Sequence, residues 1–227
     1  MVDRQVFQLR KKVFLERLEL EALQDRVDGD ILPLLRLLNS HPNIYTTSSC
    51  SGRIMVAEAV RPSYSKGKGF RPVAKWHHPV PTELIEEAIS ELDHAWLMVR
   101  GAIIHVATAD VRTAYKIVEI GRETGHKHSG IITINKGGIF VEILGEERLD
   151  IPLKHRGIET PIQPAVEMAN KTLVLAKLRL YWLAARLEAE LFGIEAPSGE
   201  EIRKAIREVA RCLDTINATT ESFYFGK

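Results

Sequence analysis

The sequence is short of cysteine, of net charge and of long apolar runs, and each shortage excludes a class of protein. Only two of its 227 residues are cysteines, too few for a disulfide framework or a cysteine zinc site. The formal net charge of +1 excludes a protein that coats nucleic acid with a uniformly basic surface. No apolar run is long enough to span a membrane, and Asp3 and Arg4 do not resemble the start of a signal peptide. We therefore expect a cytoplasmic protein without membrane association.

The common cofactor and metal motifs are also missing. No Gly-x-Gly-x-x-Gly follows a predicted strand, so a Rossmann loop is not indicated. The segment Lys66-Gly67-Lys68-Gly69 lacks the spacing and the following Ser or Thr of a phosphate-binding P-loop. His126 and His128 would share one face of a strand, but no third ligand type lies near them in the sequence. We therefore expect no metal site.

What the chain does contain is enough apolar sequence for a real core, arranged as helices, then strands, then helices. Hydrophobic residues make up 45% of the chain, and their spacing predicts helices up to residue 23, at 31–38, at 109–124 and at 163–192. The expected strands are 43–49, 53–60, 73–78, 96–99, 103–107, 131–134, 139–144 and 149–153. We predict an α+β fold, a single domain over residues 1–227 with a large mixed β-sheet flanked by N-terminal and long C-terminal helices.

Three local signals mark the ends of elements. Thr82, followed by Glu83, is the predicted N-cap of a short helix. Asn135-Lys136-Gly137-Gly138 is a predicted hairpin turn between two strands. Ser198-x-x-Glu201 is a capping-box pattern that opens the last helix. Cys212 falls among apolar residues of that helix, where core packing is the simplest interpretation.

A run of small polar residues, 46–53, separates the first two expected strands. Thr46-Thr47-Ser48-Ser49-Cys50-Ser51-Gly52-Arg53 concentrates hydroxyls, a thiol, a glycine and an arginine where a two-residue turn would be enough. Small side chains let backbone N–H groups approach a ligand, and Arg53 offers a fixed cation to a carboxylate or phosphate. The run predicts a ligand loop; a Ser/Thr-rich strand end is the alternative.

A basic segment follows. Between residues 51 and 80 there are six Lys or Arg residues and one acid, Glu58. Such a segment can follow a phosphate backbone while an aromatic ring stacks on a base. We predict RNA contacts from the following side chains: Arg61, Tyr64, Lys66, Lys68, Phe70, Arg71 and Lys75. A solvated hairpin tip is the alternative.

Several motifs, taken in order, resemble those of the wybutosine-synthesis methyltransferases. They are Asn39 with Tyr45–Ile54, Trp76-His77-His78, Ile104-His105-Val106, Gly125 with Ser129-Gly130-Ile131, Leu149–Leu153, and Ala169-Asn170-Lys171 with Arg179. The resemblance extends over most of the chain. It implies an enzyme that transfers a methyl group from S-adenosylmethionine to N4 of a 4-demethylwyosine-type base beside the anticodon of phenylalanine tRNA.

The resemblance also implies positions for the cofactor and for a base. The implied cofactor residues are Ser49, Ser51, Gly52, Arg53, Ser129, Gly130 and Asn170. The candidates for removing a proton from the acceptor nitrogen are His77 or His78, and His105, followed by Asp28 and Asp110. His77 and His78 are neighbours on an expected strand, so at most one of them faces any given pocket.

Two other functions stay open, as does the oligomeric state. Cys50 with a histidine could form a nucleophilic enzyme. The basic segment alone could make a non-catalytic tRNA-binding module. The C-terminal helices could pack internally or form a dimer contact.

Overall fold

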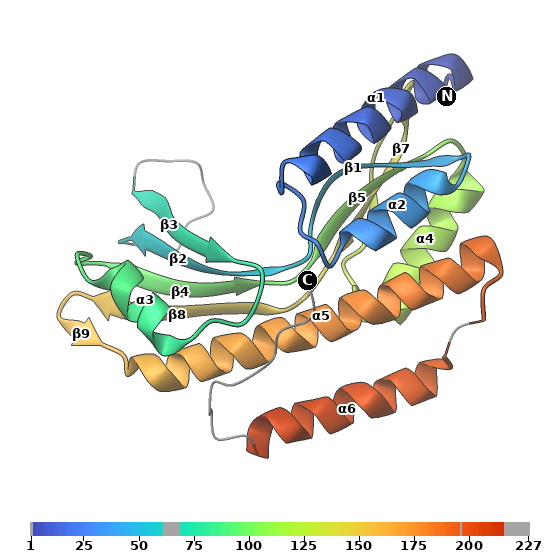
Figure 1. Ribbon diagram of the computed structural model, residues 1–227. Coiled ribbons are helices and arrows are strands. Elements are labelled where there is room, and N and C mark those ends of the chain that lie inside the picture. The colour runs from blue at the N-terminus through green and yellow to red at the C-terminus, as the bar shows by residue number, and fades with distance from the viewer. Residues whose placement is uncertain (1, 61–68, 196, 216–227) are drawn as a thin grey trace. The chain divides into compact units, whose positions relative to one another are not determined.

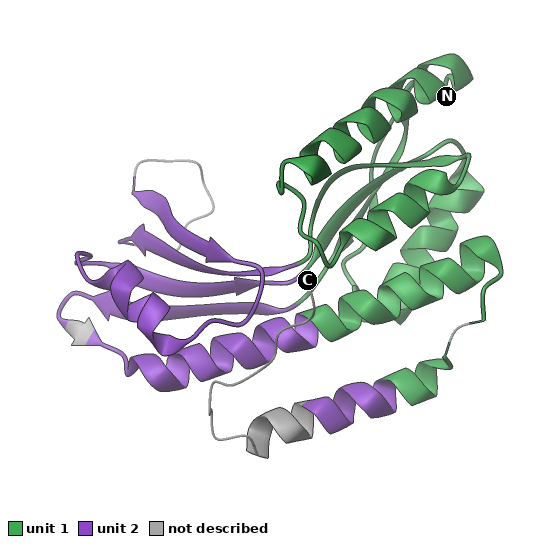
Figure 2. Cartoon of the chain, in the orientation of Figure 1, with its two compact units in different colours: residues 1–51, 102–146, 177–202 green, residues 52–101, 147–176, 203–227 purple. Residues whose placement is uncertain are grey.

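The computed structural model describes residues 2–60, 69–195 and 197–215, without the side chains of residues 158 and 210–215. Contacts divide the chain into two compact units, which Figure 2 colours separately. Unit 1 comprises residues 1–51, 102–146 and 177–202, and unit 2 comprises residues 52–101, 147–176 and 203–227. Each unit contains one antiparallel sheet, and the single domain over residues 1–227 stays a prediction.

Unit 1 is built on a four-stranded sheet in the order β1-β5-β7-β6 (Figure 1). Its strands are β1 (Ile44–Cys50), β5 (Ile103–Thr108), β6 (Gly130–Asn135) and β7 (Gly138–Leu144). Its helices are α1 (Arg4–Leu23), α2 (Leu32–Ser40), α4 (Val111–Glu123) and the later part of α5 (Ile162–Phe192). The Asp3 side chain caps α1 by accepting from the N–H groups of Gln5 and Val6.

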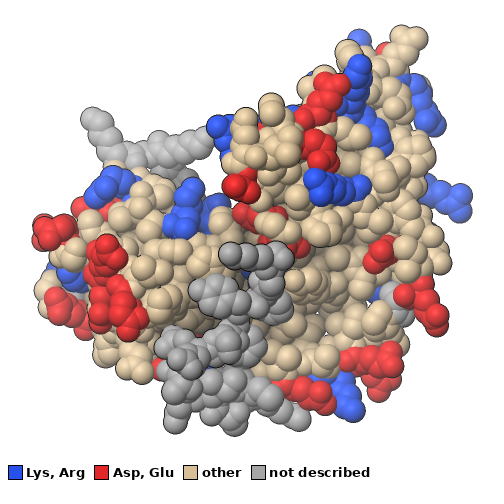
Figure 3. Space-filling model, in the orientation of Figure 1, with Lys and Arg blue, Asp and Glu red and all other residues tan. Residues whose placement is uncertain are grey.

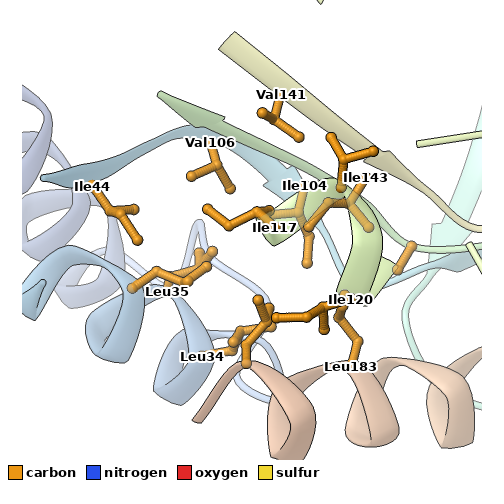
Figure 4. Close-up of a cluster of buried hydrophobic side chains, with 14 of the residues drawn as sticks. Leu34, Leu35, Ile44, Ile104, Val106, Ile117, Ile120, Val141, Ile143 and Leu183 are labelled. Atoms are coloured by element: carbon orange, nitrogen blue, oxygen red, sulfur yellow. The ribbon is translucent and has the colours of Figure 1, made fainter. Parts of the chain in front are cut away.

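The main core of unit 1 lies between this sheet and the helices α2, α4 and α5 (Figure 4). Alternate strand residues point into it, and among them Ile104 and Val106 are fully buried. The opposite face of the sheet packs against α1, where Phe7 meets Tyr45 at a ring-centroid distance of 5.1 Å. The two faces of the sheet are therefore covered by different helices.

Unit 2 contains a five-stranded sheet in the order β3-β2-β4-β8-β9. Its strands are β2 (Arg53–Ala59), β3 (Phe70–Trp76), β4 (Ala95–Arg100), β8 (Arg148–His155) and β9 (Ile158–Glu159). Helix α3 (Thr82–Ile89) and the first part of α5 supply side chains to a core on one face, while Met55, Ala57 and Met98 cluster on the other. The last helix is α6 (Gly199–Thr215).

The α+β class is confirmed, but the single mixed sheet is wrong. The strands form two sheets, and every pairing among the described residues is antiparallel. The physical reason is that β1 pairs with β5 while β2 pairs with β3 and β4, although only Ser51 and Gly52 separate β1 from β2. A connection that reads as a hairpin in the sequence is thus a change of sheet.

The turn and cap predictions have mixed outcomes. The hairpin turn is confirmed, since Asn135 pairs with Gly138 in the β6–β7 register. The capping box is confirmed, because Ser198 and Glu201 exchange hydrogen bonds across the first turn of α6. Thr82 as N-cap is wrong: Pro81 occupies that position, and no side chain caps α3. No helix in the described parts of the chain is long and apolar enough to cross a membrane.

Candidate functional site

A histidine on the sheet of unit 1 is held between a hydroxyl and a carboxylate. The Nδ1 atom of His105 lies 2.8 Å from Ser48 Oγ. Its Nε2 atom lies 2.8 Å from Glu142 Oε2. Because a carboxylate only accepts hydrogen bonds, Nε2 carries the proton and Nδ1 accepts from the Ser48 hydroxyl. His105, a predicted base, is therefore oriented at both ring nitrogens.

A β-bulge in β1 brings Ser48 opposite His105. Thr46 pairs with Val106 and Ser49 with Ile104, so two residues of β1 face the single residue His105. The polar run 46–53 is thus mostly strand: β1 ends at Cys50, and only Ser51 and Gly52 precede β2. Within that run, the Ser49 hydroxyl is buried and has no hydrogen-bond partner among the described atoms.

A buried polar network in unit 1 holds Ser51. Asp28 Oδ2 accepts from the Ser51 N–H at 2.8 Å and from its hydroxyl at 3.0 Å. Lys177 Nζ donates to Ser51 Oγ at 2.5 Å and to Asp30 Oδ2 at 2.5 Å. Ser51 is fully buried and Lys177 is 7% exposed. Asp28 is a predicted base and Ser51 a predicted cofactor residue. The structure joins the two by hydrogen bonds.

In unit 2, two polar contacts fix the segment that carries the other histidines. His77 Nδ1 lies 3.0 Å from the carbonyl oxygen of Gly52, a glycine with φ of +97°. Asn170 on α5 donates to the Val80 carbonyl at 2.8 Å and accepts from the Val80 N–H at 2.9 Å. These two hydrogen bonds of Asn170 thus hold the backbone of the segment after His77.

The strand placement of His77 and His78 is wrong, since β3 ends at Trp76 and both lie in the bend that follows. His77 is half-buried, whereas His78 is exposed and lies 2.9 Å from the Pro79 carbonyl oxygen through Nδ1. A bend rather than strand alternation separates their environments. The prolines that follow explain the early strand end, because proline offers no N–H to a sheet.

Arg53 belongs to a row of arginines across the sheet of unit 2. In the strand register Arg53 pairs with Arg100, and Arg100 pairs with Arg148. Asp150 accepts from Arg100 at 2.5 Å and from Arg148 at 2.8 Å. Burial, together with the charges of Arg148 and Arg53, lowers the pKa of Arg100, while Asp150 opposes that shift. The row concentrates positive charge around Arg53.

Ser129 and Gly130 stand at the start of β6 in unit 1. The Ser129 hydroxyl donates to the His126 carbonyl at 2.6 Å and is nearly fully buried. A Cβ added to Gly130 would meet no atom within 4 Å. A ligand can therefore come close to the backbone at Gly130. Asp110 has a structural task, because it caps α4 by accepting from the Thr113 N–H at 2.8 Å.

Among the residues that the structure describes, His126 is the group whose environment predicts the strongest pH effect on stability. It is 1% exposed, and burial, helped by the charge of Arg179, lowers its pKa from 6.5 to about 4. Between those values the unfolded chain binds a proton that the folded chain refuses, so stability falls as pH falls from 6.5 towards 4. We expect this group to contribute a loss of roughly 3 kcal/mol across that range, at about 1.4 kcal/mol per pKa unit.

Urea unfolding of wild type and His126→Phe at pH 7 and pH 4 measures that loss. The variant should show a pH dependence smaller by roughly that amount. His128→Phe is the matched control, because the His128 side chain is 79% exposed. Equal pH dependence in wild type and His126→Phe would show that His126 does not drive the effect.

The predicted RNA residues that the structure describes lie on β3, an edge strand of unit 2. Phe70 packs against the Met55 cluster, and Lys75 is exposed. Arg71 forms an ion pair with Glu58 at 2.7 Å. Lys and Arg side chains are visible over β3 in Figure 3. The other four predicted residues, Arg61, Tyr64, Lys66 and Lys68, lie outside the described residues, as does the side chain of Cys212.

Comparison with known proteins decides the family. A family model described as Methyltransferase TYW3 matches residues 9–189 of the chain. This chain belongs to that family. Its membership makes the protein an enzyme that transfers methyl groups, and the wybutosine-related resemblance of the motifs is confirmed.

Relatives of this methyltransferase occur in several archaea. A Pyrococcus abyssi protein is 35% identical over 188 residues, covering 80% of this chain and 96% of the relative. It is named tRNA(Phe) 7-((3-amino-3-carboxypropyl)-4-demethylwyosine(37)-N(4))-methyltransferase 1. An Archaeoglobus fulgidus protein with the same name, without the numeral, is 33% identical over 171 residues, covering 73% of this chain and 85% of the relative.

Solved structures show the same fold. The PH1069 protein from Pyrococcus horikoshii matches with a TM-score of 0.74 and 34% identity, covering 82% of this chain and 98% of the other. A protein from Aeropyrum pernix, titled as hypothetical, matches with a TM-score of 0.64 and 28% identity, covering 74% and 100%.

Sequence reasoning missed three residues of these networks. Asp30 lies between the first two helices, Lys177 lies in the apolar stripe of α5, and Glu142 alternates with Val141 and Ile143 on β7. Each carried a signal: a charged residue inside an apolar pattern needs a partner. The partner's identity required the fold.

Proposed function

We propose that this methyltransferase transfers a methyl group from S-adenosylmethionine to N4 of a 4-demethylwyosine-type base beside the anticodon of phenylalanine tRNA. The observation that carries the proposal is the shared name of relatives, which the chain matches over 85 to 96% of their lengths. The names of these relatives describe methyl transfer to tRNA. They therefore favour the methyltransferase over a non-catalytic tRNA-binding module and over a Cys50-nucleophile enzyme. A cytoplasmic location is part of the proposal.

The residues around β1 and β6 fit a nucleotide-like cofactor in unit 1. Gly130 leaves open space beside the sheet, and the buried Ser49 hydroxyl has an unused hydrogen-bonding capacity among the described atoms. The sulfonium of S-adenosylmethionine supplies an activated methyl group, so the protein's task is to align acceptor and donor. Ser51 serves differently: its contacts with Asp28 and Lys177 make it a support of the loop.

The cofactor predictions in unit 2 rest on charge. Arg53 is suited to a methionine carboxylate, because guanidinium binds carboxylate through two parallel N–H donors. Gly52 allows close backbone approach. Asn170 fits better as a residue that positions the backbone near His77, since it is bonded to Val80 in both directions. These roles remain predictions.

Lys75 and Arg71 make a matched pair for testing the tRNA surface on β3. We expect Lys75→Gln to weaken tRNA binding and to lower the slope of log affinity against log salt by about 1, as for one lost phosphate contact. Arg71→Gln should have a smaller effect, because Glu58 already neutralises that cation. Filter binding over a series of salt concentrations measures both slopes. Unchanged slopes in both variants would remove β3 from the tRNA surface.

A transfer assay tests the proposed activity. Phenylalanine tRNA from cells lacking this protein is incubated with it and labelled S-adenosylmethionine. We expect one methyl group per tRNA, and none on fully modified tRNA. Cys50→Ser should retain the activity, because direct transfer needs no thiol nucleophile. Tight tRNA binding without label would favour the binding module, and loss of transfer in Cys50→Ser would favour the nucleophile.

A further inference from the structure

A lateral row of residues crosses the sheet of unit 1 from β1 to β6. Ser48 lies in the bulge opposite His105, His105 pairs with Glu142 in the β5–β7 register, and Glu142 pairs with Gly130 on β6. Three of the four strands thus supply a proton-transferring group. The fourth supplies a residue without a side chain.

The row lies on the sheet face opposite the main core. Its neighbours Ile104 and Val141 point into that core and are fully buried, so His105 and Glu142 point the other way. Helix α1 packs on this face through the apolar cluster around Phe7, Tyr45 and Ala107. Beyond that cover the side chains of His105 and Glu142 are 24% and 28% exposed.

The end groups of the row are accessible. Ser48 is exposed at one end, and a Cβ on Gly130 would meet nothing within 4 Å at the other. A side chain at position 130 would stand beside Glu142. A ligand can therefore approach along the row from solvent, which distinguishes it from a buried structural hydrogen-bond chain.

We propose that Ser48, His105 and Glu142 form the proton relay of the methyl transfer, with Ser48 as the group that touches the acceptor nitrogen. This inference rests on the proposed function. Ser48 Oγ takes the proton from the ring N–H and passes its own proton to His105 Nδ1. Glu142 is a positioning residue: its bond to Nε2 keeps the proton there, so that Nδ1 is ready to accept, and it stabilises the imidazolium that forms.

The bonds and charges of this step balance. The acceptor nitrogen loses a proton and gains the methyl carbon, while the carbon–sulfur bond breaks and leaves a neutral thioether. The proton resides on His105 until solvent removes it through the exposed edge of the ring. No oxidant or additional reactant is required.

Single-turnover kinetics at saturating tRNA and cofactor test the relay. We expect Ser48→Ala to lower the rate constant about 100-fold or more, within the range for general acid–base catalysis. Glu142→Gln should lower it roughly tenfold to 100-fold, as loss of an orienting partner does. The dissociation constants for tRNA and cofactor should stay unchanged, and the double variant should lose little more than Ser48→Ala alone.

Two further measurements separate a relay from a structural role. Nitrogen NMR of the wild-type imidazole should show the proton on Nε2, and Glu142→Gln should disturb that preference. Added imidazole should restore part of the rate in His105→Ala and should leave the rate of the matched surface variant Ser40→Ala, whose hydroxyl donates to Leu37 in its own helix, unchanged. Ser40→Ala should keep full activity.

The outcomes distinguish the two levels of the proposal. A wild-type protein that transfers no methyl group overturns the proposed function, and the relay with it. An active wild type with equally active Ser48→Ala and Glu142→Gln overturns the relay alone. Rate losses matched by weakened binding of tRNA or cofactor would also overturn it, since they indicate a structural role.

Discussion

Replacing Lys177 with methionine lowers the free energy of unfolding by about 3 kcal/mol. The substitution keeps the length and apolar stem of the side chain, but removes the cation between Asp30 and Ser51. Breaking a buried ion pair from one side costs about 3–5 kcal/mol, because the other charge stays behind without its partner. Asp30 is 26% exposed, so the lower end of that range applies. Thermal or urea unfolding measures the loss.

Two comparisons sharpen this prediction. Lys12→Met is the matched control, because its pair with Glu16 is 3.9 Å long and both side chains are largely exposed; it should change stability by less than about 0.5 kcal/mol. Adding Asp30→Asn to Lys177→Met should recover part of the loss, since the uncompensated charge disappears. Equal stability of Lys177→Met and wild type would contradict the network.

Replacing Phe7 with alanine lowers the free energy of unfolding by about 3–5 kcal/mol. Phe7 is fully buried, and its ring packs on Tyr45 of the sheet beside the α1 ring of Phe14, which stacks on the same tyrosine. Truncation removes the buried ring and leaves a cavity that the neighbouring strands fill only in part. We also expect α1 to lose protection from hydrogen exchange, because its other apolar side chains include several that are exposed.

Leu9→Ala provides the control on the same helix. Leu9 is 65% exposed, so its truncation should cost less than about 0.5 kcal/mol. Similar losses in both variants would show that α1 is stabilised by helix propensity rather than by packing on the sheet.

The order of helices and strands could be predicted from the sequence because it depends on local patterns. Strand β7 reads Gly138–Leu144 in the structure and 139–144 in the prediction, and α5 differs by one residue at its start. The division into two sheets could not be predicted. Short connections such as Ser51-Gly52 resemble hairpin turns, and partner choice between strands depends on contacts far apart in the chain.

The candidate site shows the same limit. The motifs around Ser48 and His105 mark chemistry-bearing residues, but their bond spans 57 positions and arises from a bulge. The link between Lys177 and Ser51 spans 126 positions. Residue type predicts that such groups need partners, and only the fold assigns them.

The position of the transferred methyl group tests the central claim most directly. S-adenosylmethionine with a carbon-labelled methyl group is combined with the protein and with phenylalanine tRNA whose tricyclic base lacks the methyl group on N4. The labelled nucleoside is then isolated and analysed by mass spectrometry and NMR. The account predicts a single labelled methyl group on N4 of the tricyclic base. A label on the ribose or on the side chain of the base, or no label at all, would contradict it.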